Sequence, residues 1–445
     1  MNKGTSKAEK KQVSRELETH CWRFLQPLLA ELQKRLDRRL VKTVLDLVLV
    51  IVMHRHRNNG LLLSELGEHL LGSERGPAGV KRIASVLHSS RWQSQIILKH
   101  LWKQAHAKVR ELCQTAQNAY VIWDESVLEK SESLKAEGLC AVRSSKAARL
   151  KRIKPGYFNP PTDRPIFVPG FNWLQILVTG MQGIPVLAHL CWWTTRGETA
   201  SKKRVEEGKI LKKVAKLWGR KVIHVWDRGF AGAPWTLLAL DHGLRFIVRW
   251  NNKYHVVGAD GRKHEAWKVV RGKRSWSYRM IWDARRRCHR KTGILAAPIR
   301  LPQDERQLFL VVSRPGVGRK PWYLITTEPV HTAEQAWQIV FAYAKRWQIE
   351  MSLRFTKAEL AFESPRLQAW EARLKFLLIA ALAFAFLLSL LACTDFLFAF
   401  LARFCHRTGK WSRDHTSAPL YRLRLALSVL WLDVRPHSLP SLNSG

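Results

Sequence analysis

The stretch Tyr343–Leu360, "YAKRWQIEMSLRFTKAEL", decides the fold prediction. It contains good helix formers and neither Gly nor Pro, so it predicts a helix. At about 100° per residue, side chains three and four positions apart fall on one stripe of a helix. One such stripe is polar: Tyr343, Arg346, Glu350, Arg354 and Lys357. The stripe beside it is apolar: Ala342, Ile349, Leu353 and Leu360. We therefore expect a helix that packs on a core and presents an ordered polar row.

The polar row has two interpretations. It can be a solvated helix face on which Arg346–Glu350 and Glu350–Arg354 form ion pairs one turn apart. Alternatively, it holds an acid among cations at a site that handles phosphate and metal. The row alone does not decide between them, so the remainder of the chain must.

The composition points to a polyanionic partner. The chain has 445 residues, so two or three domains are expected. Its 75 Lys and Arg against 35 acids give a formal charge of +40, and they are spread along the chain. Nucleic acid is the first candidate partner and an anionic membrane surface the second. The 20 Trp residues suit a basic surface that also stacks on bases.

Two features bear on the compartment. The seven Cys are scattered without a CxxC pair, which indicates reduced thiols of a cytosolic protein, and Met1–Gln12 is too polar for a signal peptide. The segment Phe376–Cys393 is long and apolar enough for a membrane helix. A helix buried on all sides of a large core has the same composition, and we favour that interpretation.

The N-terminal part predicts helices. Residues 1–40 and Val41–Met53 are helical by pattern, and Leu61–Leu71, Val80–Trp92 and Trp102–Gln117 follow. The pair around "GSERGPAG" resembles a helix-turn-helix, with cations on one face of its second helix. An ordinary helical hairpin is the alternative.

The middle of the chain predicts an α/β sheet that carries three acids. A short buried strand, Ala119–Trp123, ends at Asp124, and the strand "KVIHVW" ends at Asp227. A β-hairpin turning at Met181–Gly183 lies between them. A β-rich insertion follows, and then the helix of Glu350. Three carboxylates without Cys or His suit Mg²⁺ or Mn²⁺, and a pair of such ions promotes phosphodiester chemistry.

The spacing Tyr343-x2-Arg346-x3-Glu350-x6-Lys357 resembles the signature of DDE transposases of the insertion-sequence-four branch. "WDES" around Asp124 and "VWDRGF" around Asp227 resemble the first two motifs of that family. The resemblance covers roughly residues 118–404. It implies an RNase H-like catalytic core with a β-rich insertion domain, preceded by an all-helical DNA-binding region.

The resemblance also implies the site residues. Asp124, Asp227 and Glu350 are expected to be the catalytic residues and to hold two Mg²⁺ or Mn²⁺ ions. The expected DNA contacts are Tyr343, Arg346, Lys357, Trp322, Arg354 and Arg228. Trp322 stands where a relative stacks a flipped base, or it is a core residue of the insertion. For Arg354 and Arg228 the alternative is that they offset a carboxylate.

Five segments are predicted. They are a helical N-terminal DNA-binding region (1–117), the first part of the core (118–250), the β-rich insertion (251–327), the second part of the core (328–404) and a C-terminal tail (405–445). The second part of the core contains the helix of the catalytic Glu and the buried apolar helix. The basic stretch 143–170 is long for its position, and its residues assign it no role.

The predicted function is that of a DNA transposase. It binds terminal inverted repeats, cleaves phosphodiester bonds with two metal ions and joins 3′-hydroxyl ends to target DNA. The expected partners are double-stranded DNA and a second copy of the chain in a dimer or larger synaptic complex. The expected location is the bacterial cytoplasm, in association with the nucleoid and without a membrane. The alternatives are a catalytically silent DNA-binding or target-selecting relative, a general nuclease of the same fold and a membrane protein with a basic cytosolic face.

Overall fold

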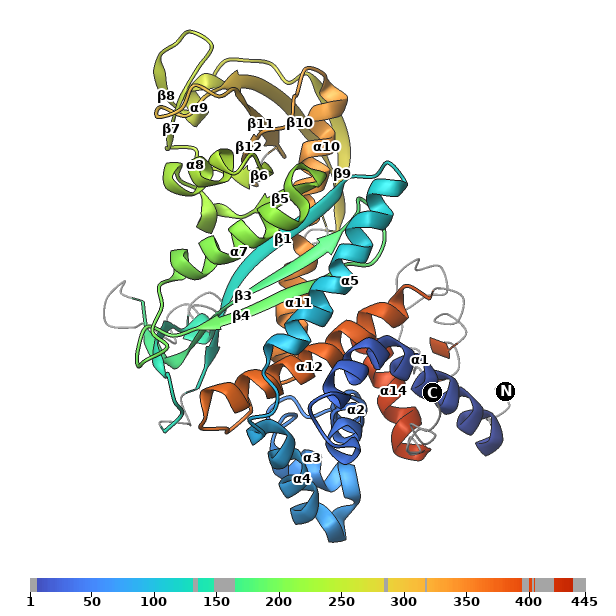
Figure 1. Cartoon of the computed structure of the whole chain (residues 1–445). Helices are drawn as coiled ribbons and strands as arrows, with labels where there is room; N and C mark the ends of the chain where they lie inside the picture. The colour runs from blue at the N-terminus through green and yellow to red at the C-terminus, as the bar shows by residue number, and fades with distance from the viewer. Residues whose placement is uncertain are drawn as a thin grey trace.

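The structure is a computed structural model that describes residues 6–130, 135–147, 165–283, 287–316, 318–393, 400–401, 404 and 420–434. Its N-terminal part is helical, as expected. The helices are α1 (Lys7–Gln33), α2 (Arg38–Met53), α3 (Leu63–Leu71), α4 (Gly76–His88) and α5 (Gln95–Gln114), with a short 3-10 turn, η1 (Ser73–Arg75), before α4. Figure 1 shows α1–α4 as a helical body beside the sheet, and α5 connects the two.

Helices α3 and α4 form a tight hairpin. A Cβ atom on Gly79 would lie 2.2 Å from the carbonyl oxygen of Gly67, so only glycines permit this backbone approach. The pair therefore has the helical-hairpin geometry that was one of the two sequence interpretations. Whether it also reads DNA stays a prediction.

A ten-stranded sheet forms the centre of the molecule, in the order β2-β3-β1-β5-β6-β12-β11-β10-β9, with β4 paired to β3. The first strands are β1 (Ala119–Glu129), β2 (Cys140–Arg143), β3 (Phe167–Thr179), β4 (Val186–Trp193), β5 (Val222–Trp226) and β6 (Arg245–Arg249). Strand β1 is antiparallel to β3 and parallel to β5. The chain is thus a mixed α/β protein with a helical N-terminal region and a large sheet.

The strands of residues 251–327 extend the same sheet. They are β9 (Ser277–Asp283), β10 (Cys288–Ile299), β11 (Leu308–Arg314) and β12 (Trp322–Thr326). Strand β12 pairs antiparallel with β6, which joins this segment to the central strands. A small separate ribbon precedes them: β7 (His255–Val257), β8 (Lys263–Glu265) and the one-turn helix α9 (Ala266–Val269). The domain limits given above stay a prediction.

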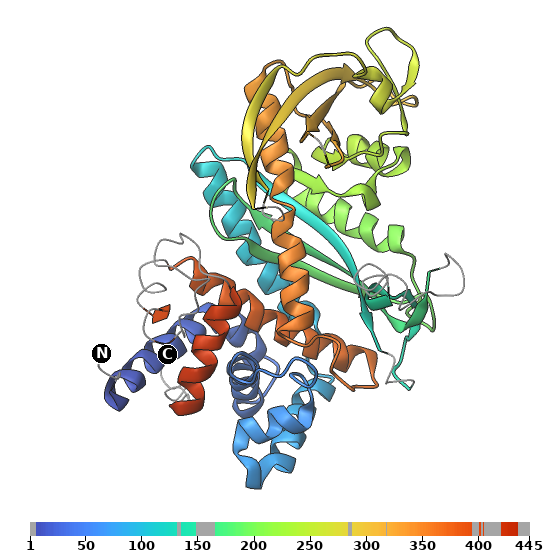
Figure 2. The ribbon, with the colours of Figure 1, turned by 180° about the vertical axis from the view of Figure 1, so that it is seen from behind.

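Helices cover both faces of the sheet (Figures 1 and 2). On one face lie α7 (Lys203–Trp218), α8 (Ala233–Asp241) and part of α5, which share one apolar cluster with the sheet. On the other lie α10 (Ala333–Ala344), α11 (Trp347–Ala358) and α12 (Trp370–Leu391). Alternate residues of β1 enter the two clusters: Val121 and Trp123 one, Tyr120 and Ile122 the other. Successive side chains of a strand point to opposite faces, so each strand serves both layers.

Two element predictions need correction. Strand β1 does not end at Trp123 but continues to Glu129, because β3 keeps pairing with it after β5 has ended. The predicted single helix around Tyr343–Leu360 is two helices, since residues 345 and 346 form a tight turn between α10 and α11. The predicted N-cap is confirmed: the Thr332 hydroxyl accepts a hydrogen bond from the backbone N–H of Gln335, 3.2 Å away.

Helix α12 explains the long apolar segment. By length and composition it could span a membrane, but 89% of its apolar window is buried within the protein. It packs against β4 and against α2, α4, α5 and α14 (Leu420–Asp433), so its whole circumference meets other elements. An all-round apolar helix is what this position requires. Of the predicted C-terminal tail, the structure describes residues 420–434; of the basic stretch 143–170, residues 148–164 lie outside the described ranges.

Candidate active site

Sheet register brings Asp124 and Asp227 together. Strands β1 and β5 are parallel, and Ile122 pairs with Val225. Asp124 and Asp227 each lie two residues further along the chain than this pair. Asp227 follows β5 directly, where its Oδ1 accepts a hydrogen bond from the backbone N–H of Gly229 at 2.6 Å. That bond fixes the carboxylate at the end of the strand.

Helix α11 brings the third acid to the same place. The Arg346 guanidinium, at the turn between α10 and α11, is hydrogen-bonded to Oε1 of Glu350 one turn later. The same guanidinium lies 3.5 Å from Oδ2 of Asp124. The Arg346–Glu350 ion pair of the first sequence interpretation therefore exists, but it lies at the acid site and not on a solvated face.

The electrostatics of Asp124 depend on both of the other acids. Burial raises the pKa of Asp124 to about 7, and the charges of Asp227 and Glu350 add to the rise. Arg346 and the N–H of Glu125 oppose it. A buried carboxyl that half-ionises near neutral pH is poised to exchange its proton for another cation.

Two aromatic residues line the cationic side of the site. The rings of Trp322 and Tyr343 meet edge to face, with centroids 5.1 Å apart. The Arg346 guanidinium lies 5.9 Å from the centroid of the Tyr343 ring. Burial raises the pKa of Tyr343. The Arg346 guanidinium opposes this rise, and neither the buried Tyr343 hydroxyl nor Nε of Arg346 makes a hydrogen bond of good geometry among the described residues, so both have capacity for a ligand.

The sequence analysis did not predict one contact that positions α11 against the sheet. Gln175 pairs with Asp124 across β1 and β3, so their side chains share a face of the sheet. Its amide donates to the Ser352 hydroxyl at 2.5 Å, which ties α11 to the sheet beside the acids. The sequence does contain a signal for this contact, because Gln175 is the only polar residue in the run Trp173–Val178. Its apolar neighbours led to a purely structural interpretation of that strand.

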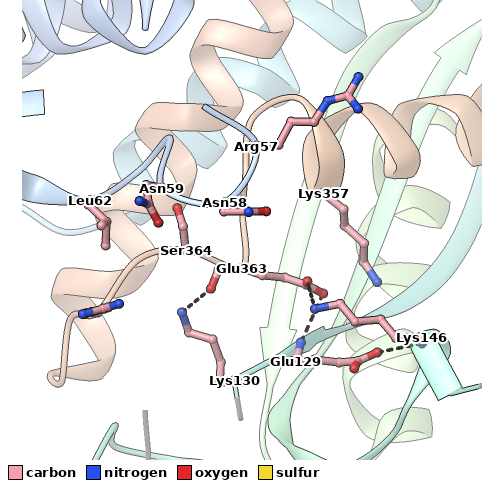
Figure 3. A pocket seen from close by; sticks show the side chains of 11 residues that line it. Arg57, Asn58, Asn59, Leu62, Glu129, Lys130, Lys146, Lys357, Glu363 and Ser364 are labelled. Carbon is pink, nitrogen blue, oxygen red and sulfur yellow. Dashed lines mark hydrogen bonds and ion pairs between the residues drawn. The ribbon is translucent and has the colours of Figure 1, made fainter. Parts of the chain in front are cut away.

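One predicted residue lies apart from the acids, and two others are exposed. Lys357 is two turns beyond Glu350 and faces a different cavity, together with Glu129, Lys146 and Glu363 (Figure 3). Arg354 and Arg228 are exposed. Lys357 therefore does not point to the acids, and the roles expected for Lys357, Arg354 and Arg228 in DNA contact stay predictions. The apolar row is confirmed: Ala342, Ile349, Leu353 and Leu360 are all buried.

The chemical type of the three acids suits a divalent cation. Carboxylate oxygens are the ligands that Mg²⁺ and Mn²⁺ prefer, and the raised pKa of Asp124 indicates that its charge lacks full compensation. Within the described ranges, however, no three His, Cys, Asp or Glu side chains lie close enough to hold a metal ion together. The Arg346 guanidinium interacts with Glu350 and Asp124 instead, and so supplies the positive charge between them.

Comparison with known proteins places the chain in a family. Residues 162–386, just over half of the 445, match the family model of the transposase DDE domain, a range that includes Asp227 and Glu350 and begins after Asp124. No curated protein matches the chain. A similar solved structure is a cryo-EM structure of the piggyBac transposase synaptic complex with hairpin DNA. It has 13% identity and a TM-score of 0.41, covering 96% of this chain and 80% of that chain. On the strength of the domain match, this chain belongs to the DDE transposase family.

Proposed function

We propose that this DNA transposase uses Asp124, Asp227 and Glu350 as its catalytic acids, in the manner of the insertion-sequence-four branch. The observation that carries the proposal is their convergence: sheet register aligns the two Asp residues, and the charges of Asp227 and Glu350 both act on buried Asp124. We also assign an RNase H-like core to the strand order β4-β3-β1-β5-β6, with β9–β12 as its insertion.

The proposed chemistry is cleavage of DNA at the terminal inverted repeats and joining of the 3′-hydroxyl ends to a target. Two Mg²⁺ or Mn²⁺ ions held by the three carboxylates would activate a water or a 3′-hydroxyl and stabilise the leaving oxygen. Asp124 must lose its proton to take part, so activity should rise with pH through the region of its pKa.

Arg346 and Tyr343 are proposed to bind the DNA backbone. A guanidinium can donate two parallel hydrogen bonds to one phosphate. When Arg346 turns from Glu350 to a phosphate, it also uncovers the carboxylates it now neutralises. The Tyr343 hydroxyl offers one more donor, and half-buried Trp322 beside it offers an aromatic face to a base. Paired DNA ends imply a dimer or larger assembly.

A labelled duplex that ends in the element's own flanking repeat tests the proposal. Wild-type protein should cut at the repeat boundary with Mg²⁺ and not with EDTA. Asp227→Ala and Glu350→Gln should abolish the cuts and leave DNA binding within about threefold, because both residues serve the chemistry. If Glu350→Gln also abolishes binding, Glu350 is a structural residue instead.

The runner-up functions give different results in the same assay. A catalytically silent DNA-binding relative would bind the duplex and produce no cuts with any divalent ion. A general nuclease would cut with Mg²⁺ but would join no 3′-hydroxyl to a second duplex. The raised pKa of Asp124 favours catalysis over the silent alternative, because a purely binding protein has no need to hold this carboxyl near two other acids.

A further inference from the structure

Strand β9 presents an exposed apolar stripe at one end of the sheet. Successive side chains of a strand alternate between its two faces, so every second residue shares a face. One face of β9 and of the residue before it carries four large side chains that are between 46 and 60% exposed: Trp276, Tyr278, Met280 and Trp282. We call these four residues the β9 stripe. Scattered exposed apolar residues are normal, but four in one row indicate a binding surface.

The opposite face of β9 anchors the strand. The Arg279 guanidinium pairs with Glu334 and lies 5.2 Å from the centroid of the Trp337 ring, both on α10, beside which β9 lies in Figure 1. The Asp283 carboxylate is buried, and Nε of Arg290 lies 3.1 Å from it. The stripe therefore lies on a strand that is held in place from its other face.

Residues of β10 hold two rings of the stripe. Tyr278 pairs with Gly293, where a Cβ atom would lie 2.8 Å from Cε1 of the Tyr278 ring, so the missing side chain makes room for the ring. The Lys291 ammonium lies 4.8 Å from the centroid of the same ring. The rings of Trp282 and His289 meet edge to face, with centroids 5.2 Å apart. A ligand that contacts these rings therefore has little ordering to do.

The stripe is surrounded by positive charge. Residues 271–293 contain nine Lys and Arg residues and one acid, Asp283, which lies on the anchored face. Lys291 and His289 are exposed on the side of the stripe. A second copy of the chain would bring the same cations to this surface, and like charges repel. A polyanion that also has apolar faces fits better, and nucleic acid is a partner of that kind.

The rings of the stripe suit bases of an unpaired strand. In a duplex the flat faces of the bases are covered by their neighbours, whereas single-stranded bases stack on aromatic side chains whatever the sequence. Side chains two residues apart on one face of a β-strand are separated by about 6.6–6.8 Å. Because bases stack at about 3.4 Å, one base fits between two successive side chains of the stripe. The stripe is about 20 Å long and would hold roughly three bases.

We propose that the β9 stripe binds unpaired nucleotides of DNA: its three aromatic rings stack on bases, and Lys291 contacts a phosphate. The stripe is distinct from Trp322, which lies on β12, three strands away in the sheet. Cutting at a transposon end is the reaction that would supply unpaired nucleotides, and in this respect the inference rests on the proposed function.

Binding of a labelled single strand of about 12 nucleotides in EDTA tests the proposal without any dependence on cleavage. The stripe variant is Tyr278→Thr with Trp282→Thr, since Thr suits a β-strand. The control is Phe167→Thr with Tyr254→Thr, two exposed aromatic residues outside the stripe. Fluorescence anisotropy should show an affinity loss of about tenfold or more for the stripe variant and less than about threefold for the control. Equal losses in the two variants, or an equal loss of the stripe variant for a blunt duplex of the same sequence, would overturn the proposal.

An abasic strand separates stacking from charge. Its backbone keeps every phosphate but has no bases, so wild type should bind it about tenfold or more weakly than the complete strand. The stripe variant should bind the two strands with nearly equal affinity, because the bases have lost their partners. Lys291→Gln should instead reduce the slope of log affinity against log salt by about 0.7, whereas the stripe variant should keep the slope of wild type. If wild type binds the abasic strand as tightly as the complete one, the rings contact no base and the proposal is wrong.

Light scattering in the absence of DNA tests the rival occupant. Among the described strands β9 has one partner, β10, and an edge strand of this kind can pair with a second copy. If wild type is a dimer, the stripe variant is a monomer and both bind the single strand equally, the stripe is an interface between copies and the proposal is wrong. Failure of the proposed function is distinguishable, because Mg²⁺-dependent cuts would then be absent while base-dependent binding stays intact.

Discussion

Asp124 combines burial with two neighbouring carboxylates. Its position shows what the sequence motif predicts correctly and what it does not predict. The sequence places it after an apolar run, which is correct, but predicts a strand end there. In the structure β1 continues to Glu129, and only the pairing with β5 ends near Asp124. Motif spacing identifies the acid, whereas the length of β1 depends on pairing with β3, a contact between residues far apart in sequence.

Replacement of Asp124 by Asn should stabilise the metal-free protein, and more so at high pH. The folded pKa of Asp124 is about 7, against an ordinary pKa of 3.8, so between those pH values the native state holds a proton that the unfolded chain has lost. Wild-type stability therefore falls as pH rises toward 7, while an amide has no charge to bury. Between about pH 5 and pH 8 the advantage of Asp124→Asn should grow by about 2–3 kcal/mol. Urea denaturation in EDTA measures it, and a constant difference would contradict the burial of this charge.

At the scale of elements, α7 and β1 bring together a second pair of acids, Glu207 and Glu125, which no sequence motif predicts. Glu207 on α7 is fully buried, and its Oε1 and that of Glu125 on β1 are both buried without a donor. Burial, a hydrogen bond with Glu125 and the charge of Glu125 raise the pKa of Glu207. One proton shared between two carboxyls accounts for this arrangement.

Glu207→Gln should therefore stabilise the protein increasingly as pH rises above neutrality. Wild type loses stability as pH rises from the normal range of a Glu toward the raised folded pKa, and the Gln amide replaces the shared proton with a permanent donor. Glu206→Gln is the matched control, because the pKa of Glu206 is shifted in the opposite direction. Burial raises that pKa, but hydrogen bonds from Lys209 and Ser201 outweigh burial and lower it. The control should be destabilised by a constant amount between about pH 6 and pH 9. Thermal unfolding across that range separates the two, and parallel curves would exclude the shared proton.

The elements also show which predictions patterns can supply. Periodicity predicted the helices and most strands, and the Thr332 cap, because those depend on neighbouring residues. It missed the tight turn at residues 345 and 346, which contains neither Gly nor Pro. It also assigned Lys357 to the acid site, because Lys357 and Glu350 fall on one stripe of the helix, although Lys357 lies two turns further along α11. The residues that line the cavity of Lys357 come from β1, from the segment after β2 and from the segment after α11, and spacing along one helix cannot show them.

At the scale of the whole molecule, α12 joins the helical region to the sheet. Helix α12 meets β4 on one side and α2 and α4 on the other, so the helical region and the sheet share one apolar core. The α2–α3 loop (residues 54–62) is thereby held at the cavity around Lys357.

The formal charge of +40 should make DNA binding steeply dependent on salt. Each phosphate that a cation neutralises releases condensed counterions, and a protein with six to ten such contacts loses about 10³–10⁵ in affinity between about 50 and 200 mM salt. Anisotropy titrations of the terminal-repeat duplex across that range, in EDTA, should give a straight line of log affinity against log salt with a slope of about −5 to −9. Glu350→Gln is the control that should keep this slope, because the acid touches no phosphate in the proposed complex. A slope shallower than about −2 with tight binding would mean that most of the basic surface faces something other than DNA.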